Sequence, residues 1–459
     1  MLRKISVFLL VFFAVQALSV YPASSSVAFR DLAARSAIIA EKDSGLILYE
    51  HNSDIRHPAD SLTKIMTIYI AAQKVENDEI SDHELITMTE SAWYDLNDNS
   101  STQNIIAGEQ MTFIDLMYSA YVGNANEACN MLALRMAGSI SSFVSMMNEK
   151  AAELGADNTQ FTNAHGQFNQ SQYTTAYDQF IIFSAAMKNP LFAEIAGTFR
   201  HITESTYETE SRTLSSSNSL INQGSRYHYR YCIAGRDSAT YEGGYSLVAF
   251  AEEDNLALVS VILGSDVLIL PDESTDMRSF SESLRLFNWA FTQFAWRDIL
   301  KTTDLLAKVP VLHGSGADFV NARPESALTL LLDNSIPSES FERKYVIYSD
   351  ESGNALVAPV NAGDVLGEVT ISRNGIEYAK IALIANTNVN LSGVEYIRGQ
   401  IMDMLSTSTA RIILLILAGI LLLYIALVIR YNIIRANRIR RIKDAKEDII
   451  RERHQNYRD

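Results

Sequence analysis

The sequence predicts an α+β fold, in which an antiparallel sheet joins a helical cluster, followed by a small all-β domain and one transmembrane helix. Three observations predict it. Apolar residues recur at helical spacing through a long segment that strand patterns flank on both sides. From Lys308 onward, short alternating strands and polar turns replace the helical spacing. The segment Ile412–Ile429 is 18 residues without a charge, long enough to cross about 30 Å of hydrocarbon.

Charge is unevenly distributed along the 459 residues, whose formal net charge is −16. Residues 1–28 carry +2, residues 430–459 carry +5, and the body between them carries −23. An acidic body excludes a general nucleic-acid binder, because affinity for phosphate needs a basic surface. Two cysteines in so long a chain exclude a disulfide scaffold and a four-cysteine zinc site. Whether Cys129 and Cys232 form a bridge stays open at this point.

The N-terminal residues 1–28 have the pattern of a signal peptide. Arg3 and Lys4 supply the charged start, Val7–Leu18 is apolar, and Ser26–Ala28 offers small residues for cleavage. A buried N-terminal helix and a permanent membrane anchor are the alternatives.

The C-terminal segments predict a membrane anchor. An amphipathic juxtamembrane stem at 391–410 leads into a transmembrane helix at 411–430, and a basic tail follows at 431–459. Lys and Arg cluster directly after the apolar run, whereas Arg411 stands alone before it. By the positive-inside rule, the tail is cytoplasmic and the acidic body is extracellular. A buried core helix is the alternative interpretation of the apolar run.

The first predicted domain spans 29–298. Short apolar runs around the turn Lys42–Gly45 predict two strands, and helical spacing continues from Ser61 to about Lys188. Two further strands are expected at Ser246–Ala251 and Ala257–Leu263. The domain closes with an amphipathic helix, whose apolar face carries Phe280, Leu284, Phe287, Phe291 and Phe294.

The second predicted domain, at 305–390, is small and all-β. Its clearest local signal is Asn374-Gly375, with alternating apolar residues on both sides, which is typical of a tight β-hairpin.

Ser61-Leu62-Thr63-Lys64 is the sharpest chemical pattern. A serine hydroxyl becomes a good nucleophile only when a base removes its proton. Three residues along a helix place Lys64 on the same face as Ser61, and a partly buried lysine with a lowered pKa can accept that proton. The pattern alone has little specificity, because Ser and Lys three apart on an exposed helix usually have no function.

Several longer stretches of the chain resemble segments of a known enzyme family. They are AIIAEKDSGLILYEHNSDIRHPADSLTKIMT, Gly108–Thr112 with Asp115–Tyr118, Asn124–Cys129, Met147–Ala151 with Leu154-Gly155, His165-Gly166, Tyr173–Asp178, Ala358-Pro359 and Gly363–Gly367. In order and spacing they resemble the serine-type D-alanyl-D-alanine carboxypeptidases, the low-molecular-weight penicillin-binding proteins of peptidase family S11. The resemblance covers nearly the whole predicted extracellular part and implies a penicillin-binding-protein/β-lactamase-like fold.

The family's three motifs are S-x-x-K, S-x-N and K-T-G. Ser61 and Lys64 match the first, although one extra residue, Asp60, separates the serine from Pro58-Ala59. In the second motif Asn126 is kept, but the serine position holds Asn124, whose amide cannot relay a proton as a hydroxyl does.

The third motif departs most, because Arg236-Asp237-Ser238 stands at the Lys-Thr-Gly position while Thr240 is kept. Arg236 keeps the positive charge that would bind a substrate carboxylate, and the Ser238 side chain could crowd the strand along which substrate lies. The resemblance implies an oxyanion hole formed by the backbone N–H groups of Ser61 and Ala239.

These features imply a membrane-anchored hydrolase of the bacterial cell envelope that trims peptidoglycan stem peptides. Ser61 is the expected nucleophile and Lys64 the general base, with Asn126 from the second motif. Asn124, Arg236, Ala239 and Thr240 are the expected substrate-binding residues. β-Lactams are expected to acylate the same serine, and no metal or cofactor is expected.

There are two alternatives to a carboxypeptidase. The altered motifs also fit a catalytically weak or inactive relative that binds cell-wall peptides or partner proteins. A β-lactamase would need an efficient deacylating base, for which the sequence offers no candidate.

Overall fold

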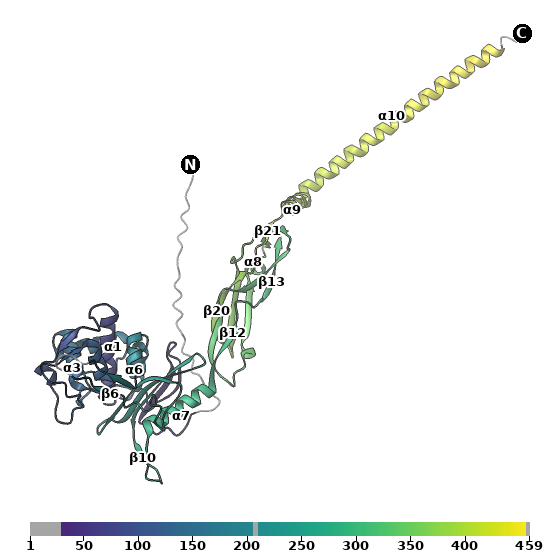
Figure 1. Cartoon of the computed structure of the whole chain (residues 1–459). Coiled ribbons are helices and arrows are strands. Elements are labelled where there is room, and N and C mark those ends of the chain that lie inside the picture. Colours follow the sequence, from purple (N-terminus) through teal and green to yellow (C-terminus); the bar gives the residue numbers. More distant parts are fainter. Residues whose placement is uncertain (1–28, 205–209, 354, 456–459) are drawn as a thin grey trace. The chain divides into compact units, whose positions relative to one another are not determined.

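The computed structural model describes residues 29–204, 210–353 and 355–455, so the predicted signal peptide lies outside the described residues (Figure 1). The chain divides into two compact units. The first contains the chain up to Arg297 together with Thr329–Ser338, and the second contains Asp298–Leu328 and the chain from Glu339 onward.

One segment inside the predicted 305–390 domain, Thr329–Ser338, clusters with the first unit. It does so because β16 (Leu328–Asp333) pairs with β12 (Phe294–Leu300). In addition, the Asn334 N–H donates to the Gln293 carbonyl at 2.7 Å. Backbone pairing of this kind joins residues distant in sequence, which strand patterns alone do not indicate.

A five-stranded antiparallel sheet forms the centre of the first unit, in the order β2-β1-β9-β8-β7. Its strands are β1 (Ser36–Glu41), β2 (Ile47–His51), β7 (Cys232–Thr240), β8 (Gly244–Glu253) and β9 (Leu256–Ser265). The strand pairs predicted on either side of the helical segment are thus confirmed. β7 is an edge strand, so one side of its backbone is free to pair with another segment.

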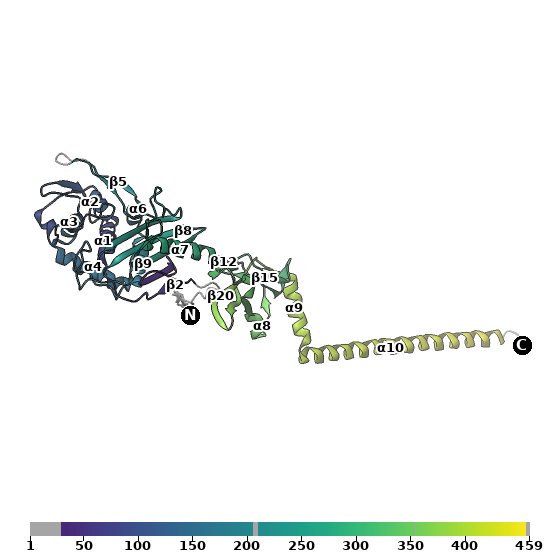
Figure 2. The same cartoon turned by 90° about the horizontal axis from the view of Figure 1, so that it is seen from below.

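Both faces of this sheet are covered, which agrees with the nearly continuous apolar run of β9, buried at every position. On β9, Val259 and Val261 pack into one hydrophobic cluster, whereas Leu258 and Ile262 pack into the other. The predicted amphipathic helix, α7 (Arg278–Gln293), packs against β8 and β9 in the second cluster. Figure 2 shows α1 to α4 gathered on one side of the sheet and α7 on the other.

The remaining helices of the first unit form the predicted helical cluster. They are the 3-10 turns η1 (Asp60–Leu62) and η2 (Glu90–Trp93), and α1 (Thr63–Glu76), α2 (Phe113–Tyr121), α3 (Asn126–Ala137), α4 (Ile140–Leu154), α5 (Ala176–Ala186) and α6 (Pro190–Gly197). The side chains of Thr112, Ser139, Thr175 and Asn189 accept N–H hydrogen bonds at the starts of α2, α4, α5 and α6. Every residue of α1 from Thr63 to Ala72 is buried, so this helix lies at the centre of the cluster.

Short two-stranded sheets complete the first unit. They are β3 (Leu85–Thr87) with β4 (Gln110–Thr112), β5 (Arg200–Ile202) with β6 (Thr213–Ser215), and β10 (Val267–Ile269) with β11 (Thr275–Met277).

The second unit is built on a six-stranded sheet in the order β17-β19-β20-β15-β13-β18. Its elements are β13 (Ala307–Leu312), β14 (Gly314–Ser315), β15 (Phe319–Pro324), η3 (Ser338–Ser340), β17 (Glu342–Ile347), α8 (Tyr348–Ser352), β18 (Leu356–Val357), β19 (Val365–Arg373), β20 (Ile376–Ala385) and β21 (Asn390–Leu391). β19 and β20 form the predicted hairpin, and Asn374 and Gly375 both have positive φ, 52° and 78°, as a type I′ turn requires.

Two helices end the described chain, α9 (Gly393–Ser406) and α10 (Ser408–Gln455). Within α10, Arg411–Glu447 is a candidate membrane span of 37 residues, none of it buried in the protein. The apolar run therefore belongs to an exposed helix, and the alternative of a buried core helix is wrong.

Candidate active site

Ser61 lies in the 3-10 turn η1, immediately before α1 begins. Its neighbours Asp60 and Leu62 are buried, whereas Ser61 itself is half-buried. Asp60 has a positive φ of 44°, a conformation that non-glycine residues rarely adopt. The inserted residue therefore turns the chain sharply, directly before the serine.

Lys64 is almost completely buried, with 1% of its surface exposed. Its Nζ donates to Asn126 Oδ1 at 2.7 Å and to the His165 carbonyl at 2.6 Å. Burial lowers the pKa of Lys64 to about 8, against a smaller opposing effect of Cys129. A neutral amine has two N–H donors and a lone pair. Both donors are thus used in binding Asn126 and His165, and the lone pair remains to accept a proton.

The Ser61 hydroxyl has no hydrogen-bond partner among the residues that the structure describes, so it forms no hydrogen bond with Lys64. The Ser61 backbone does form hydrogen bonds, since its N–H donates to Ser238 Oγ at 3.2 Å and its carbonyl accepts from Arg236 Nε at 3.4 Å.

The second motif connects α2 to α3. Asn124 lies in the connecting turn with a φ of 56°, which asparagine tolerates better than most residues. Asn126 is the first residue of α3, and its side chain reaches Lys64. The two asparagines of the motif thus serve different partners, since Asn124 accepts a hydrogen bond from Arg236.

The third motif lies on the edge strand β7. Because side chains alternate along a strand, Arg236, Ser238 and Thr240 share one face. We call these three residues the β7 contact row. Ser238 and Arg236 hold the backbone of Ser61, and the Thr240 hydroxyl donates to Asp60 Oδ2 at 2.7 Å.

The Arg236 guanidinium is buried, with only 2% exposed. Besides the Ser61 carbonyl, it binds the Tyr121 carbonyl at 2.5 Å and the side chain of Asn124. Three of its five N–H donors are therefore used by the protein itself. Asp237 points to the other side of β7, where Ser217 donates to it at 2.7 Å, and Ala239 is exposed.

The hydrogen bonds of these residues form two groups. Lys64 binds Asn126, and Arg236 binds Asn124 and the backbone of Ser61. The two groups meet along the chain, because Ser61 precedes α1 and Asn124 precedes α3. Thr240 joins them through Asp60, and Ala239 follows Ser238 on β7.

Sequence reasoning missed three contributors. The His165 carbonyl binds Lys64, and burial lowers the pKa of the His165 imidazole to about 3, so this ring is neutral. Asp60 is buried, which raises its pKa. Gly166, with φ 90°, packs so tightly on Asp60 that a Cβ would lie 1.8 Å from the Asp60 carbonyl oxygen. The pair His165-Gly166 indicated only a turn, because a backbone contact leaves no trace in residue type.

Cys129 and Cys232 are both free thiols, so the bridge that the sequence left open does not form. Cys129 is buried beside the site, and burial raises its pKa to about 11. It is therefore a neutral thiol rather than a competing nucleophile.

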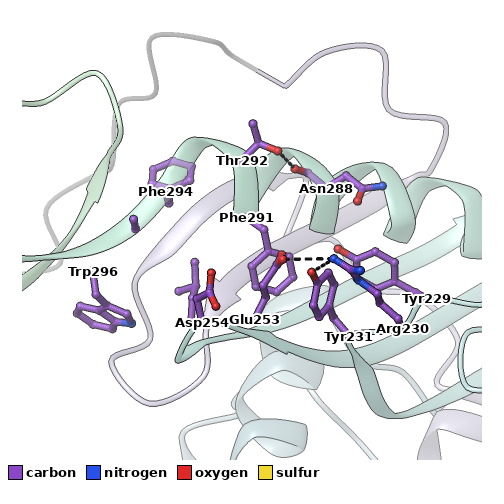
Figure 3. A pocket seen from close by; sticks show the side chains of 12 residues that line it. Tyr229, Arg230, Tyr231, Glu253, Asp254, Asn288, Phe291, Thr292, Phe294 and Trp296 are labelled. Carbon is purple, nitrogen blue, oxygen red and sulfur yellow. Dashed lines mark hydrogen bonds and ion pairs between the residues drawn. The ribbon is translucent and has the colours of Figure 1, made fainter.

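A separate pocket of about 510 Å³ contains none of the predicted site residues (Figure 3). It is lined by Tyr229, Arg230, Tyr231, Glu253, Asp254, Leu256, Asn288, Phe291, Thr292, Phe294, Ala295 and Trp296. Arg230 stacks on the Tyr231 ring at 4.3 Å and lies 4.0 Å from Glu253. None of the lining residues belongs to the three family motifs, so this pocket is distinct from the serine turn.

Comparisons with known proteins identify the family and the fold. The family model described as D-alanyl-D-alanine carboxypeptidase matches residues 23–267. The chain is 28% identical to D-alanyl-D-alanine carboxypeptidase DacC of Escherichia coli, over 81% of this chain and 88% of that protein. It is 25% identical to DacF of Bacillus subtilis, over 78% and 87% of the two chains.

Among solved structures, penicillin binding protein 5 from Haemophilus influenzae has a TM-score of 0.59 at 24% identity, covering 79% of this chain and 99% of that chain. PBP3 from Streptococcus pneumoniae also has a TM-score of 0.59, at 22% identity, with 79% and 100% covered. These likenesses show the fold, which is that of the penicillin-binding proteins and β-lactamases. The family model matches more than half of this chain. The chain therefore belongs to the D-alanyl-D-alanine carboxypeptidase family, peptidase family S11.

Proposed function

We propose that this protein is a membrane-anchored serine carboxypeptidase that removes the terminal D-alanine from peptidoglycan stem peptides. The observation that carries the proposal is the environment of Lys64 next to the serine turn. A buried lysine with a pKa of about 8 is partly neutral near neutral pH, which a general base for a serine hydroxyl requires.

The proposed reaction has two steps. Ser61 Oγ attacks the carbonyl carbon of the penultimate D-alanine while Lys64 takes the hydroxyl proton. The peptide C–N bond then breaks, the departing D-alanine nitrogen receives that proton, and an ester remains on Ser61. Water hydrolyses the ester and regenerates the hydroxyl. A β-lactam would acylate Ser61 by opening its ring amide in the same way.

Substrate binding is assigned to the surrounding residues. The N–H groups of Ser61 and Ala239 would stabilise the oxyanion. Arg236 and Thr240 would face the terminal carboxylate, and Asn124 and Asn126 would bind the peptide. The two N–H donors that Arg236 does not use within the protein support this role, because a carboxylate accepts two parallel bonds.

The cellular location is proposed from the apolar and basic segments of the C-terminal part. The apolar part of α10 would anchor the protein in the cytoplasmic membrane, with the basic tail inside and the catalytic unit in the cell envelope. The second unit would then be a spacer or a surface for protein partners that are not yet identified.

A second function is favoured by one observation. Ser238 Oγ already accepts the hydrogen bond of the Ser61 N–H, an N–H that the reaction needs for the oxyanion. This contact supports the alternative of a catalytically weak or inactive relative that binds cell-wall peptides.

Labelled penicillin distinguishes the two functions. We expect an adduct on the peptide containing Ser61, its loss in Ser61→Ala, and its retention in Ser145→Ala, a control on the exposed surface of α4. D-Alanine release from a peptide ending in D-Ala-D-Ala should follow the same pattern. A well-folded wild-type protein without an adduct would contradict the enzyme and favour the binding protein.

A further inference from the structure

Apart from Asp237, which points to the other side of β7, the residues that depart from the family pattern lie around the serine turn. The inserted Asp60 accepts a hydrogen bond from Thr240, and Asn124 accepts one from Arg236. Ser238, at the glycine position of the third motif, accepts one from the N–H of Ser61. These departures therefore form one connected arrangement around the serine turn.

The contact of Ser238 has a direct chemical consequence. An oxyanion hole stabilises the transition state only if its N–H donors are free to bind the developing negative charge. Here the Ser61 N–H is occupied by a neutral hydroxyl in the resting protein. Glycine has no side chain with which to make this contact, so the substitution itself creates the competitor.

The rest of the β7 contact row keeps Ser238 in place. Ser238 is buried, with 4% exposed, and the residues on either side of it on the same face hold the serine turn as well. Arg236 also ties β7 to the Tyr121 carbonyl at the end of α2. Moving Ser238 away by shifting β7 would therefore break several hydrogen bonds, whereas rotating its side chain breaks one.

We infer that Ser238 limits the acylation rate by competing with the substrate oxyanion for the Ser61 N–H. The inference rests on the proposed function of Ser61 as nucleophile. A hydrogen bond to an oxyanion is about twice as strong as one to a neutral hydroxyl, so a substrate can displace Ser238. Breaking the bond to Ser238 costs about one neutral hydrogen bond. Acylation of Ser61 is therefore about fivefold slower than it would be with a free Ser61 N–H.

The test compares matched serine-to-alanine variants of the full chain in detergent. Ser238→Ala removes the competing hydroxyl and keeps the Cβ. Ser217→Ala removes a hydroxyl from the opposite side of β7, where it binds Asp237 and not the serine turn. The second-order rate of acylation by a fluorescent penicillin is measured for each, with Ser61→Ala as the blank.

We expect Ser238→Ala to be acylated about fivefold faster than wild type, and Ser217→Ala at the wild-type rate. Amide hydrogen exchange in the peptide containing Ser61 should also be faster in Ser238→Ala, because the N–H loses its acceptor. Adducts that form on Ser61 at equal or lower rates in Ser238→Ala would overturn the inference while leaving the proposed function intact. Absence of an adduct in every variant would overturn the proposed function and the inference with it.

Discussion

Burial and a neighbouring positive charge both lower the pKa of Lys64. Burial removes water from the Lys64 ammonium and lowers its pKa. The oxygen acceptors of Asn126 and His165 can accept hydrogen bonds from either the charged or the neutral form of Lys64. The neighbouring Arg236 also lowers the pKa of Lys64, because two positive charges repel each other. A lysine that would be fully charged in water is thus partly neutral near pH 8.

The rate of acylation should therefore depend on pH. Because the neutral amine is the base, the rate should rise with pH, reach half its maximum near pH 8 and level off above it. Below the pKa it should fall about tenfold per pH unit. A profile of penicillin acylation between pH 6 and 10 measures this. Lys64→Gln should abolish acylation, and a flat wild-type profile would contradict the role of Lys64.

The hydrogen bond between Asn124 and Arg236 should be detectable as an energetic coupling. The variants Asn124→Ala, Arg236→Met and their combination form a double-mutant cycle for the free energy of unfolding. Because the bond involves a buried charged group, we expect a coupling of about 1.5–3 kcal/mol. Denaturant unfolding of the four proteins measures it. Additive effects would mean that the two motifs are independent of each other.

At the scale of elements, the site depends on how the serine turn is supported. The edge strand β7 holds η1 from one side, and the loop around Gly166 holds it from the other. Neither support belongs to α1, which carries Lys64. The serine turn is therefore held by segments outside the helix that carries Lys64.

Gly166→Ala should displace the serine turn, because its Cβ would lie 1.8 Å from the Asp60 carbonyl oxygen. Gly155→Ala is the matched control, since Gly155 has a similar φ of 82° with nothing within 4 Å of the added Cβ. Both variants incur backbone strain of about 1 kcal/mol. Only Gly166→Ala adds the clash, so it should be at least about 2 kcal/mol less stable than the control and acylated more than tenfold slower.

Thermal unfolding and penicillin acylation of these two glycine variants measure the difference. Equal melting temperatures and rates would show that the loop does not support the serine turn.

At the scale of the whole molecule, the proposed location depends on one helix. The exposed span in α10 is apolar along its first part, and a cluster of positive charges follows. The length and composition of this helix make it a candidate to cross a bilayer. In the proposed topology, the positive charges would set the direction in which the chain crosses the membrane.

Trypsin should therefore cut the tail at 431–459 only from the cytoplasmic side. In intact spheroplasts the tail should survive, whereas in inverted membrane vesicles it should be removed, because its Lys and Arg residues become accessible. Mass mapping of the C-terminal peptides measures the outcome. A cytoplasmic marker protein checks that the spheroplasts are intact, and cleavage of the tail in them would reverse the predicted topology.

Local patterns in the sequence determined much of the fold. The hairpin at Asn374-Gly375, the amphipathic α7 and the apolar run of α10 each depend on contacts within a few residues or on one environment, so periodicity and turn chemistry predict them. The S-x-x-K spacing of Ser61 and Lys64, together with the surrounding stretches, indicated the family.

Only the tertiary structure decided what surrounds that serine. Ser238 is 177 residues away from Ser61 along the chain, and Arg236 is 112 residues from Asn124. The sequence showed that these positions differ from the family pattern, but it could not show that the differing side chains bind the serine backbone and one another. Hydrogen bonds between distant segments depend on strand register and on the path of each loop, and these follow from packing of the whole unit rather than from local residue type.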